Sequence, residues 1–451
     1  MVGSNRSTSQ PGDNLVDLGH RSVGWCEAHG GVDEMKRPNA SLLIGIVILL
    51  ASPVHGQQWE RFRGSNGSGV SSAATIPAQW TAADYNWKID LPGIGHSSPV
   101  LWGKKLFLTS GDEATGRRFV LCLDVQTGKQ RWQRTFQAPQ HRKHQLNSYA
   151  SATPVVDAKR VYVCWGTPEQ VLVMALDQQG RTLWQRDLGP YQGGHGFGVS
   201  PIRTGKLLVL PNDQAGQSSL IALDCETGKT VWRIQRETKS AYATPCLHRR
   251  PDGSEELVFT SWEQGIIGID PRTGKTNWAA NVFDKSHVES SIGSPVIAGD
   301  LVLGVCGWLG HGNEVVAVRP PADGAGKTSQ VYRITRGAPL CTTPLVHEEL
   351  LFLWSDKGIV SCADSATGKL HWTKRIGKMF YASPVCAGQR IYNIDVDGTV
   401  VVLAASKEYQ LLGRTDLGEA SHSTPAIADG VMYLRTLSHV YSLGQAAASK
   451  P

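Results

Sequence analysis

The amino-acid sequence predicts an all-β protein, namely an eight-bladed β-propeller with four-stranded antiparallel blades. Three observations carry this prediction. A turn that ends in Thr-Gly-Lys recurs along the chain, and a Ser-Pro or Thr-Pro step occurs eight times at a regular interval. The last repeat also lacks an outer strand, and a segment near the N-terminus can supply it. We therefore expect a ring closed by an N-terminal strand that joins the last blade.

The recurring turn is clearest at residues 222–232, Ala-Leu-Asp-Cys-Glu-Thr-Gly-Lys-Thr-Val-Trp. Asp224 and Thr227 can hydrogen-bond the backbone of a tight turn, and Gly228 supplies the positive φ that such turns often need. Further copies lie at residues 121–132, 268–278 and 362–372, with a looser copy at 175–184 and a worn one at 316–332. A periodic series of this kind indicates a repeat architecture.

The Ser/Thr-Pro steps set the period of the repeat. The eight prolines are Pro99, Pro154, Pro201, Pro245, Pro295, Pro344, Pro384 and Pro425. The first and last are 326 residues and seven intervals apart, a mean near 47 residues, which lies within the range typical of propellers and solenoids. The first period reads as strands at 98–101, 105–109, 118–123 and 130–135, and four strands per repeat describe a propeller blade.

Ring closure follows from the two ends of the repeat region. The last repeat offers strands at 425–428, 431–435 and 439–443, while residues 86–91, Asn-Trp-Lys-Ile-Asp-Leu, resemble the tryptophan-bearing fourth strand of the other repeats. Closure by this strand removes an exposed sheet edge. We therefore assign residues 57–84 as a lead-in, 85–445 as the propeller and 446–451 as a disordered tail.

The N-terminal region has the outline of an export segment. Residues 1–34 are polar and read as a non-native upstream extension or a disordered segment. Residues 35–56 form a predicted signal peptide, with a basic Met-Lys-Arg start and an apolar run at 42–51. That run is shorter than the ~20 residues of a membrane span. We expect a periplasmic or secreted protein with no stable membrane span after cleavage, the alternative being an uncleaved anchor.

Composition and cysteine usage exclude several classes of protein. The formal net charge is +6 over 451 residues and no long basic run occurs, so nucleic-acid binding is not expected. The eight cysteines after the export segment are scattered without Cys-x-x-Cys spacing. Buried thiols are the simplest interpretation, and export leaves one or two disulfides open.

The pattern Ala-x-Asp-x-x-Thr-Gly-Lys-x-x-Trp resembles the tryptophan-docking repeat of the PQQ-like (pyrroloquinoline-quinone) propeller superfamily, over residues 85–445. The resemblance implies that the strand tryptophans dock against neighbouring blades; these are Trp87, Trp132, Trp184, Trp232, Trp278 and Trp372. The superfamily includes quinoprotein alcohol dehydrogenases, which use PQQ and calcium, and BamB-like outer-membrane assembly factors, which are not catalytic. The adjacent Cys-Cys pair and the Cys-x-x-Cys-His haem site of the dehydrogenase branch are absent from this sequence.

Loop lengths indicate which face of the ring carries function. From the outer-strand aromatic to the next proline the count is 12 in three repeats, but 22, 17 and 17 for the loops after Trp132, Trp184 and Trp278. The candidate ligand-binding residues come from the longer loops, from the positions three residues before each proline and, for His311, from a loop between second and third strands. These are His96, His144, Asn147, His195, Tyr242, His287, Glu289, His311, Tyr381 and His422. The loops between second and third strands add carboxylates, including Asp112, Glu113, Asp213, Glu263, Asp356 and Asp397.

The sequence favours an exported, non-catalytic binding or scaffolding module of the cell envelope, whose partner is an envelope protein or a polar small molecule. It assigns no catalytic residue and no metal ligand, and PQQ and calcium enter only through the resemblance. The alternative is a quinoprotein-like oxidoreductase, a PQQ-dependent dehydrogenase with its site at the histidine-rich mouth. A further alternative is a hydrolytic or lyase-type site that uses His144, His195 or His287.

Overall fold

A computed structural model describes residues 58–239, 241–286, 290–308, 311–322 and 327–445. The chain divides into two units, Met1–Pro53 and Val54–Pro451, and all described residues belong to the second. The predicted extension at 1–34, the export segment at 35–56 and the tail at 446–451 lie outside the described residues. Within the described ranges, no helix is long and apolar enough to cross a membrane.

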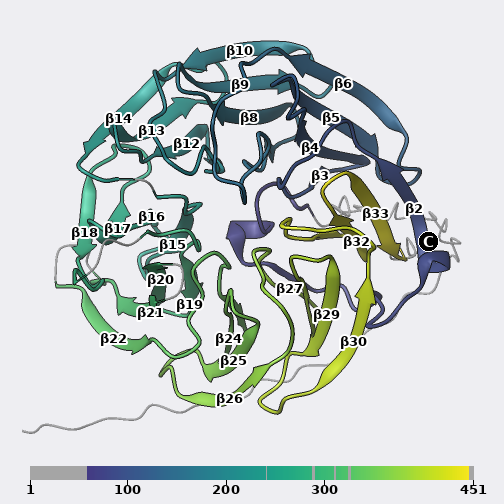
Figure 1. Ribbon diagram of the computed structural model, residues 1–451. Coiled ribbons are helices and arrows are strands. Elements are labelled where there is room, and N and C mark those ends of the chain that lie inside the picture. The colour runs from purple at the N-terminus through teal and green to yellow at the C-terminus, as the bar shows by residue number, and fades with distance from the viewer. Residues whose placement is uncertain (1–57, 240, 287–289, 309–310, 323–326, 446–451) are drawn as a thin grey trace, which may run out of the picture. The chain divides into compact units, whose positions relative to one another are not determined.

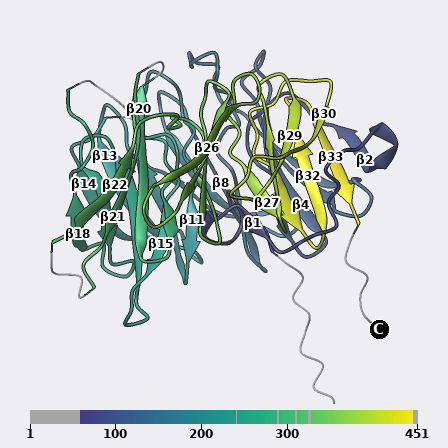
Figure 2. The ribbon, with the colours of Figure 1, turned by 90° about the horizontal axis from the view of Figure 1, so that it is seen from below.

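Eight sheets follow one another around a central axis, each running from an inner to an outer strand (Figures 1 and 2). Blade 1 comprises β3 (Val100–Trp102), β4 (Lys105–Gly111), β5 (Arg118–Asp124) and β6 (Gln130–Phe136), and blade 2 comprises β7 (Val155–Val156), β8 (Arg160–Gly166), β9 (Val171–Asp177) and β10 (Thr182–Asp187). Blade 3 comprises β11 (Ile202–Thr204), β12 (Leu207–Asn212), β13 (Ser218–Asp224) and β14 (Thr230–Arg236), and blade 4 comprises β15 (Cys246–Arg249), β16 (Glu255–Ser261), β17 (Gly265–Ile269) and β18 (Thr276–Ala280). Blade 5 comprises β19 (Val296–Ala298), β20 (Leu301–Trp308), β21 (His311–Arg319) and β22 (Ser329–Ile334), and blade 6 comprises β23 (Leu345–His347), β24 (Leu350–Trp354), β25 (Ile359–Asp364) and β26 (Leu370–Arg375). Blade 7 comprises β27 (Val385–Ala387), β28 (Arg390–Ile394), β29 (Thr399–Ala404) and β30 (Leu411–Asp416), and blade 8 comprises β31 (Ala426–Ala428), β32 (Val431–Arg435), β33 (His439–Gly444) and β2 (Tyr85–Asp90).

The fold class and the mode of closure predicted from the sequence are confirmed. Strand β2 pairs antiparallel with β33, with Ile89 opposite Val440, and so becomes the outer strand of blade 8. One blade differs from the predicted pattern, because β1 (Val70–Ser71) adds a fifth, parallel strand inside β27. The lead-in therefore contributes to the ring before β2 begins.

The lead-in residues 58–69 cross the centre of the ring. Trp59 bridges to Leu101 of blade 1, and the buried Arg61 donates a 2.6 Å hydrogen bond to the Pro245 carbonyl of blade 4. Asn66 exchanges hydrogen bonds of 2.7 Å with the backbone of Leu247. The short 3-10 helix η1 (Ser65–Gly67) stands at the axis in Figure 1. This segment, residues 58–69, is called the plug below.

Residues 72–84 then run outward across blades 7 and 8, ending in the 3-10 helix η2 (Ala82–Asp84). The Tyr392 hydroxyl of blade 7 donates to the Ile76 carbonyl at 2.9 Å, and Thr75 donates to the Gly430 carbonyl of blade 8 at 3.0 Å. The segment passes close over Gly413, where an added Cβ would lie 2.1 Å from the Ala78 carbonyl oxygen. This strap links the first and last parts of the ring in addition to β2.

The tryptophan docking implied by the resemblance is visible in five of the six tryptophans. The indole N–H of Trp232 donates to the Pro271 carbonyl in the turn of the next blade at 2.8 Å, and Trp87, Trp132, Trp184 and Trp372 make the equivalent bond at 3.0–3.2 Å. The turn glycine of the next blade lies under the rings of Trp87, Trp132, Trp184 and Trp232: a Cβ on Gly228 (φ 68°) would come 2.7 Å from the Trp184 ring. The Trp372 ring instead packs against Tyr409 of the next blade, with ring centroids 5.3 Å apart. The Thr-Gly-Lys glycine thus permits the turn and the docking of its neighbour.

Trp278 departs from this pattern. Its indole N–H donates to Glu256 Oε2 of its own blade at 2.7 Å, although the ring still packs with Val302 and Val316 of blade 5. Glu256 is buried and also accepts from Asn277 at 2.7 Å.

Candidate functional site

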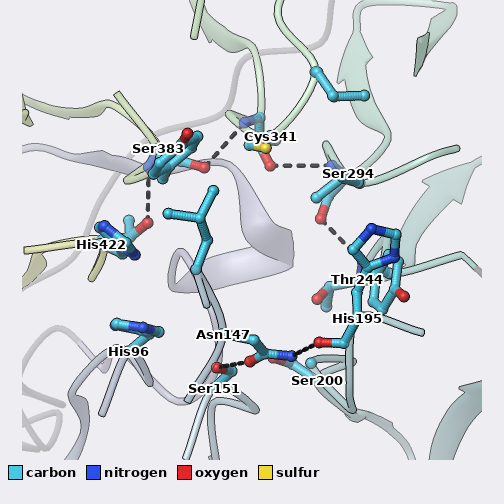
Figure 3. Close-up of a pocket in the computed structure, with 18 of the residues that line it drawn as sticks. His96, Asn147, Ser151, His195, Ser200, Thr244, Ser294, Cys341, Ser383 and His422 are labelled. Atoms are coloured by element: carbon cyan, nitrogen blue, oxygen red, sulfur yellow. Dashed lines mark hydrogen bonds between the residues drawn. The ribbon is translucent and has the colours of Figure 1, made fainter. Parts of the chain in front are cut away.

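A cavity of about 270 Å³ opens on the axis at the face where the longer loops emerge. All eight positions three residues before the prolines line it: His96, Ser151, Gly198, Tyr242, Ile292, Cys341, Tyr381 and His422. Each inner strand begins at this level, so the propeller geometry brings one such residue from every blade to the axis. We call this cavity the cup (Figure 3).

The cup is encircled by the hydroxyl groups of the Ser/Thr-Pro steps, called the hydroxyl belt. Its members are Ser98, Thr153, Ser200, Thr244, Ser294, Thr343, Ser383 and Thr424. Backbone N–H groups of one blade donate to the hydroxyl oxygen of the next, as from Ser98 to Thr153 Oγ1 at 3.0 Å and from Ser383 to Thr424 Oγ1 at 2.9 Å. Six such bonds of 2.9–3.0 Å connect neighbouring blades. The belt therefore explains why a hydroxyl precedes each proline.

The plug forms the base of the cup. Phe62 lines the cavity, and the neighbouring Arg63 is fully buried and donates to the Thr343 carbonyl at 2.8 Å. Arg63 has φ 60°, in the left-handed region that costs a non-glycine residue ~1–2 kcal/mol, and the contacts of its side chain hold it there. Sequence reasoning did not assign these residues, because the plug lies outside the periodic region and has no repeat to compare with.

Two of the longer loops interlock beside the cup. The His144 amide donates to the His195 carbonyl at 3.3 Å, and the Asn147 side-chain amide donates to the same carbonyl at 2.7 Å. The Asn147 amide oxygen accepts hydrogen bonds from the Ser148 amide at 2.8 Å and from the Ser151 hydroxyl. The loops between β6 and β7 and between β10 and β11 thereby place His144 and His195 in the cavity wall.

The histidines of the wall form two pairs. The ring centroids of His96 and His422 are 4.5 Å apart, and those of His144 and His195 are 5.1 Å apart. Burial lowers the pKa of His96 well below its ordinary value, and His422, Arg435 and Lys143 lower it further. Burial also lowers the pKa of His422, and burial together with His144 lowers the pKa of His195. These three imidazoles are neutral at neutral pH.

The structure brings together most but not all of the candidate residues. His96, His144, Asn147, His195, Tyr242, Tyr381 and His422 line the cup. His287 and Glu289 lie outside the described residues, and His311 is placed only by its backbone as the first residue of β21.

The carboxylates of the loops do not reach the cup in the described part of the chain. Asp213 is buried against Arg236 at 3.2 Å, and Asp356 accepts the backbone amides of Leu340 and Cys341 at 2.6 and 2.9 Å. Loop membership predicted their face of the ring, but the direction of each side chain depends on local partners. The sequence contains no pattern that fixes those partners.

The donor set does not fit a calcium–quinone pair. Calcium requires six to eight oxygen ligands, usually with carboxylates among them. The described lining contains no Asp, Glu, Lys or Arg side chain. The described residues also hold no group of three or more His, Cys, Asp or Glu side chains placed to bind a metal ion. The pKa of the Cys341 thiol is raised far above its ordinary value by burial and by Asp356, so this thiol is a poor nucleophile.

Taken together, the ring, the docking tryptophans and the axial cup define a PQQ-like eight-bladed propeller. The family model described as "Outer membrane protein assembly factor BamB" matches residues 169–331 and 327–444. These segments cover more than half of the chain, and the chain belongs to this family.

Relatives lie on both sides of the division between assembly factors and dehydrogenases. Outer membrane protein assembly factor BamB of Moranella endobia is 23% identical over 271 residues, 57% of this chain and 65% of that protein. Polyvinylalcohol dehydrogenase of a Pseudomonas species is 23% identical over 344 residues, 69% of this chain and 50% of that protein. The chain thus spans half to two thirds of the length of these relatives. The crystal structure of BamB from Moraxella catarrhalis has a TM-score of 0.56 at 16% identity, covering 81% of this chain and all of the other, and it supports the fold.

Proposed function

We propose that this protein is an exported, non-catalytic binding module of the cell envelope that engages an envelope protein through the face bearing the cup. The single observation that carries the proposal is the cup itself, to which every blade contributes neutral side chains and which the plug closes at its base. A recess that is closed at its base and lined by neutral side chains suits binding better than passage or acid–base chemistry. Membership of the BamB family supports the same role.

The rim of the cup supports a protein partner. Trp308 lines the cup with 39% of its surface exposed, and Met379, in the loop before β27, is 45% exposed. Exposed tryptophan and methionine side chains beside a cavity are typical of protein-binding surfaces. The Tyr381 hydroxyl, 3.9 Å from the Met379 sulfur, connects this rim to the cup wall.

Site-specific photo-crosslinking in cells tests the proposal. A photoreactive residue at position 379 is expected to crosslink to a defined envelope protein in the envelope fraction. The same residue at position 183 is the matched control, because Leu183 is an equally exposed apolar side chain (50%) on the outer strand β10. Equal crosslinking from both positions, or recovery of the protein in the cytoplasmic fraction, would contradict the proposal.

A dehydrogenase is the second candidate, favoured by the polyvinylalcohol dehydrogenase relative. Purified protein mixed with PQQ and calcium is expected to show neither stoichiometric quinone binding nor dye-linked oxidation of alcohols. Turnover that Tyr242→Phe or His422→Ala abolishes without unfolding the protein would replace the first proposal by this one.

A further inference from the structure

The hydrogen-bonding groups of the cup are unequally divided between donors and acceptors. Oxygen atoms of the hydroxyl belt accept backbone N–H groups at six steps, but their own O–H groups have no acceptor in the described part of the chain. Ser98 Oγ makes no hydrogen bond to any described residue, and the bond of Ser98 to Thr153 comes from its backbone N–H. The amide oxygen of Asn147 is already used by Ser148 and Ser151, and the described lining has no carboxylate. The cup therefore offers several O–H donors that have no acceptor among the described residues.

Two buried cations stand directly behind the lining. Arg63 donates to the carbonyl of the belt residue Thr343, and burial lowers its pKa to about 9, with no carboxylate acting on it. Arg435 is also fully buried and donates to the Ser97 carbonyl at 2.9 Å, beside His96 and Ser98. Both guanidinium groups remain charged at neutral pH.

The surrounding carboxylates offset this positive charge only in part. Glu419 acts on Arg435, but it also accepts hydrogen bonds from Ser438 and from Thr436. Asp356 lies behind the wall formed by Leu340 and Cys341, and burial raises its pKa. Among the described residues no carboxylate acts on Arg63, so the base of the cup is electropositive although its walls are neutral. Buried His96 Nδ1, which has no hydrogen-bond partner among the described residues, provides a further polar atom in the wall.

We propose that the cup binds a single carboxylate group, held by belt hydroxyls above the plug, with the apolar part of the same molecule against Phe62 and the rim. Hydroxyl donors suit an acceptor-only oxyanion, and hydrogen bonds to charged groups are worth about twice those to neutral ones. The carboxylate belongs either to a small organic acid or to the C-terminal residue of a bound polypeptide. This inference rests on the proposed role of the cup-bearing face as the binding face.

Two matched acid–amide pairs test the ligand class by isothermal titration calorimetry on the full chain. Benzoate against benzamide represents a free organic acid, and N-acetyl-phenylalanine against its amide represents a chain terminus. We expect each acid that binds to do so about tenfold more tightly than its amide, and the better acid identifies the source. Equal affinity of acid and amide, or no binding of either acid, would overturn the inference.

Variants locate the site. Ser98→Ala removes a lining hydroxyl while keeping the backbone bond from residue 98 to Thr153, so acid affinity should fall about tenfold or more at an unchanged melting temperature. Ser254→Ala, in the β15–β16 hairpin, is the matched control and should not change binding. Arg63→Met should weaken binding of the acid to a similar extent. If Arg63→Met does not fold, the acid affinity of Ser98→Ala alone tests the location of the site. Unchanged acid affinity in Ser98→Ala would contradict the assignment of the carboxylate site to the cup.

The two proposals fail separately. Crosslinking at position 379 that persists in a protein without preference for acids removes only the carboxylate site. Acid binding that depends on Ser98 in a protein without position-specific crosslinks removes the protein-scaffolding role and leaves the ligand class standing.

Discussion

Replacing the tryptophan by phenylalanine at two blade-to-blade contacts should lower the free energy of unfolding by amounts that differ in size and in pH dependence. Trp232 and Trp278 are both buried (8% and 4% exposed), so the change removes nearly the same apolar surface at each. Trp232 donates to a neutral carbonyl at 2.8 Å, whereas Trp278 donates to the buried carboxylate of Glu256 at 2.7 Å. A neutral hydrogen bond contributes ~1 kcal/mol and one to a charged group ~1.5–3 kcal/mol. Trp278→Phe should therefore lower the free energy of unfolding by ~1 kcal/mol more than Trp232→Phe at pH 7.

The pH dependence separates hydrogen bonding from packing. Burial alone would raise the pKa of Glu256, but hydrogen bonds from His248, Trp278 and Asn277 lower it overall. Because the folded pKa lies below the unfolded value near 4.5, the stabilisation is present above pH 4.5 and is lost as the pH falls through the folded pKa. As the pH falls, the additional loss in free energy of unfolding caused by Trp278→Phe should become smaller, whereas the loss caused by Trp232→Phe should stay constant. Guanidinium unfolding between pH 7 and 3.5, followed by circular dichroism, measures both, and a pH-independent difference would refute the reasoning.

Two further perturbations test the closure of the ring. Gly413→Ala places a Cβ 2.1 Å from the Ala78 carbonyl oxygen and should lower the free energy of unfolding by ~1–3 kcal/mol, because it displaces the strap. Gly194→Ala is the control and should change stability little, because a Cβ there meets nothing within 4 Å. Thermal unfolding compares the two variants, and equal losses of stability would show that the strap moves without cost. Glu419→Gln tests a second carboxylate: burial would raise its pKa, but hydrogen bonds from Ser438, Thr436 and His439 lower it to about 2. The variant should lose ~2 kcal/mol above pH 4.5, less as the pH falls toward 2, and a loss that persists unchanged at low pH in the same unfolding assay would contradict this assignment.

The periodic part of the fold could be read from the sequence because each blade repeats the same local chemistry. The Thr-Gly-Lys turn, the docking tryptophan and the Ser/Thr-Pro step recur, so one interpretation accounts for eight blades. Regular geometry also placed residues such as His96 and His422 at the axis, since every inner strand starts at the same level. The meaning of the hydroxyl before each proline was not predictable, because its partner, the N–H of the preceding blade, lies about one repeat away in sequence.

The features that the sequence did not predict are those that occur once. The plug has no repeat to compare with, and Arg63 adopts a left-handed backbone that nothing in its neighbourhood of the sequence demands. Trp278 carries the same motif as the other docking tryptophans, and only the contact with Glu256 distinguishes it. The loop carboxylate Asp356 was expected near the mouth, but it turns inward because two backbone amides bind it.

The plug changes what the centre of this propeller can do. An open channel would expose both ends of the axis to water, and polar groups along it would be hydrated equally from either side. Here Phe62 closes one end, and Arg63 brings a buried cation to that closed end. The same lead-in then crosses blades 7 and 8 as the strap before it supplies β2. The segment that closes the ring therefore also forms the base of the cup.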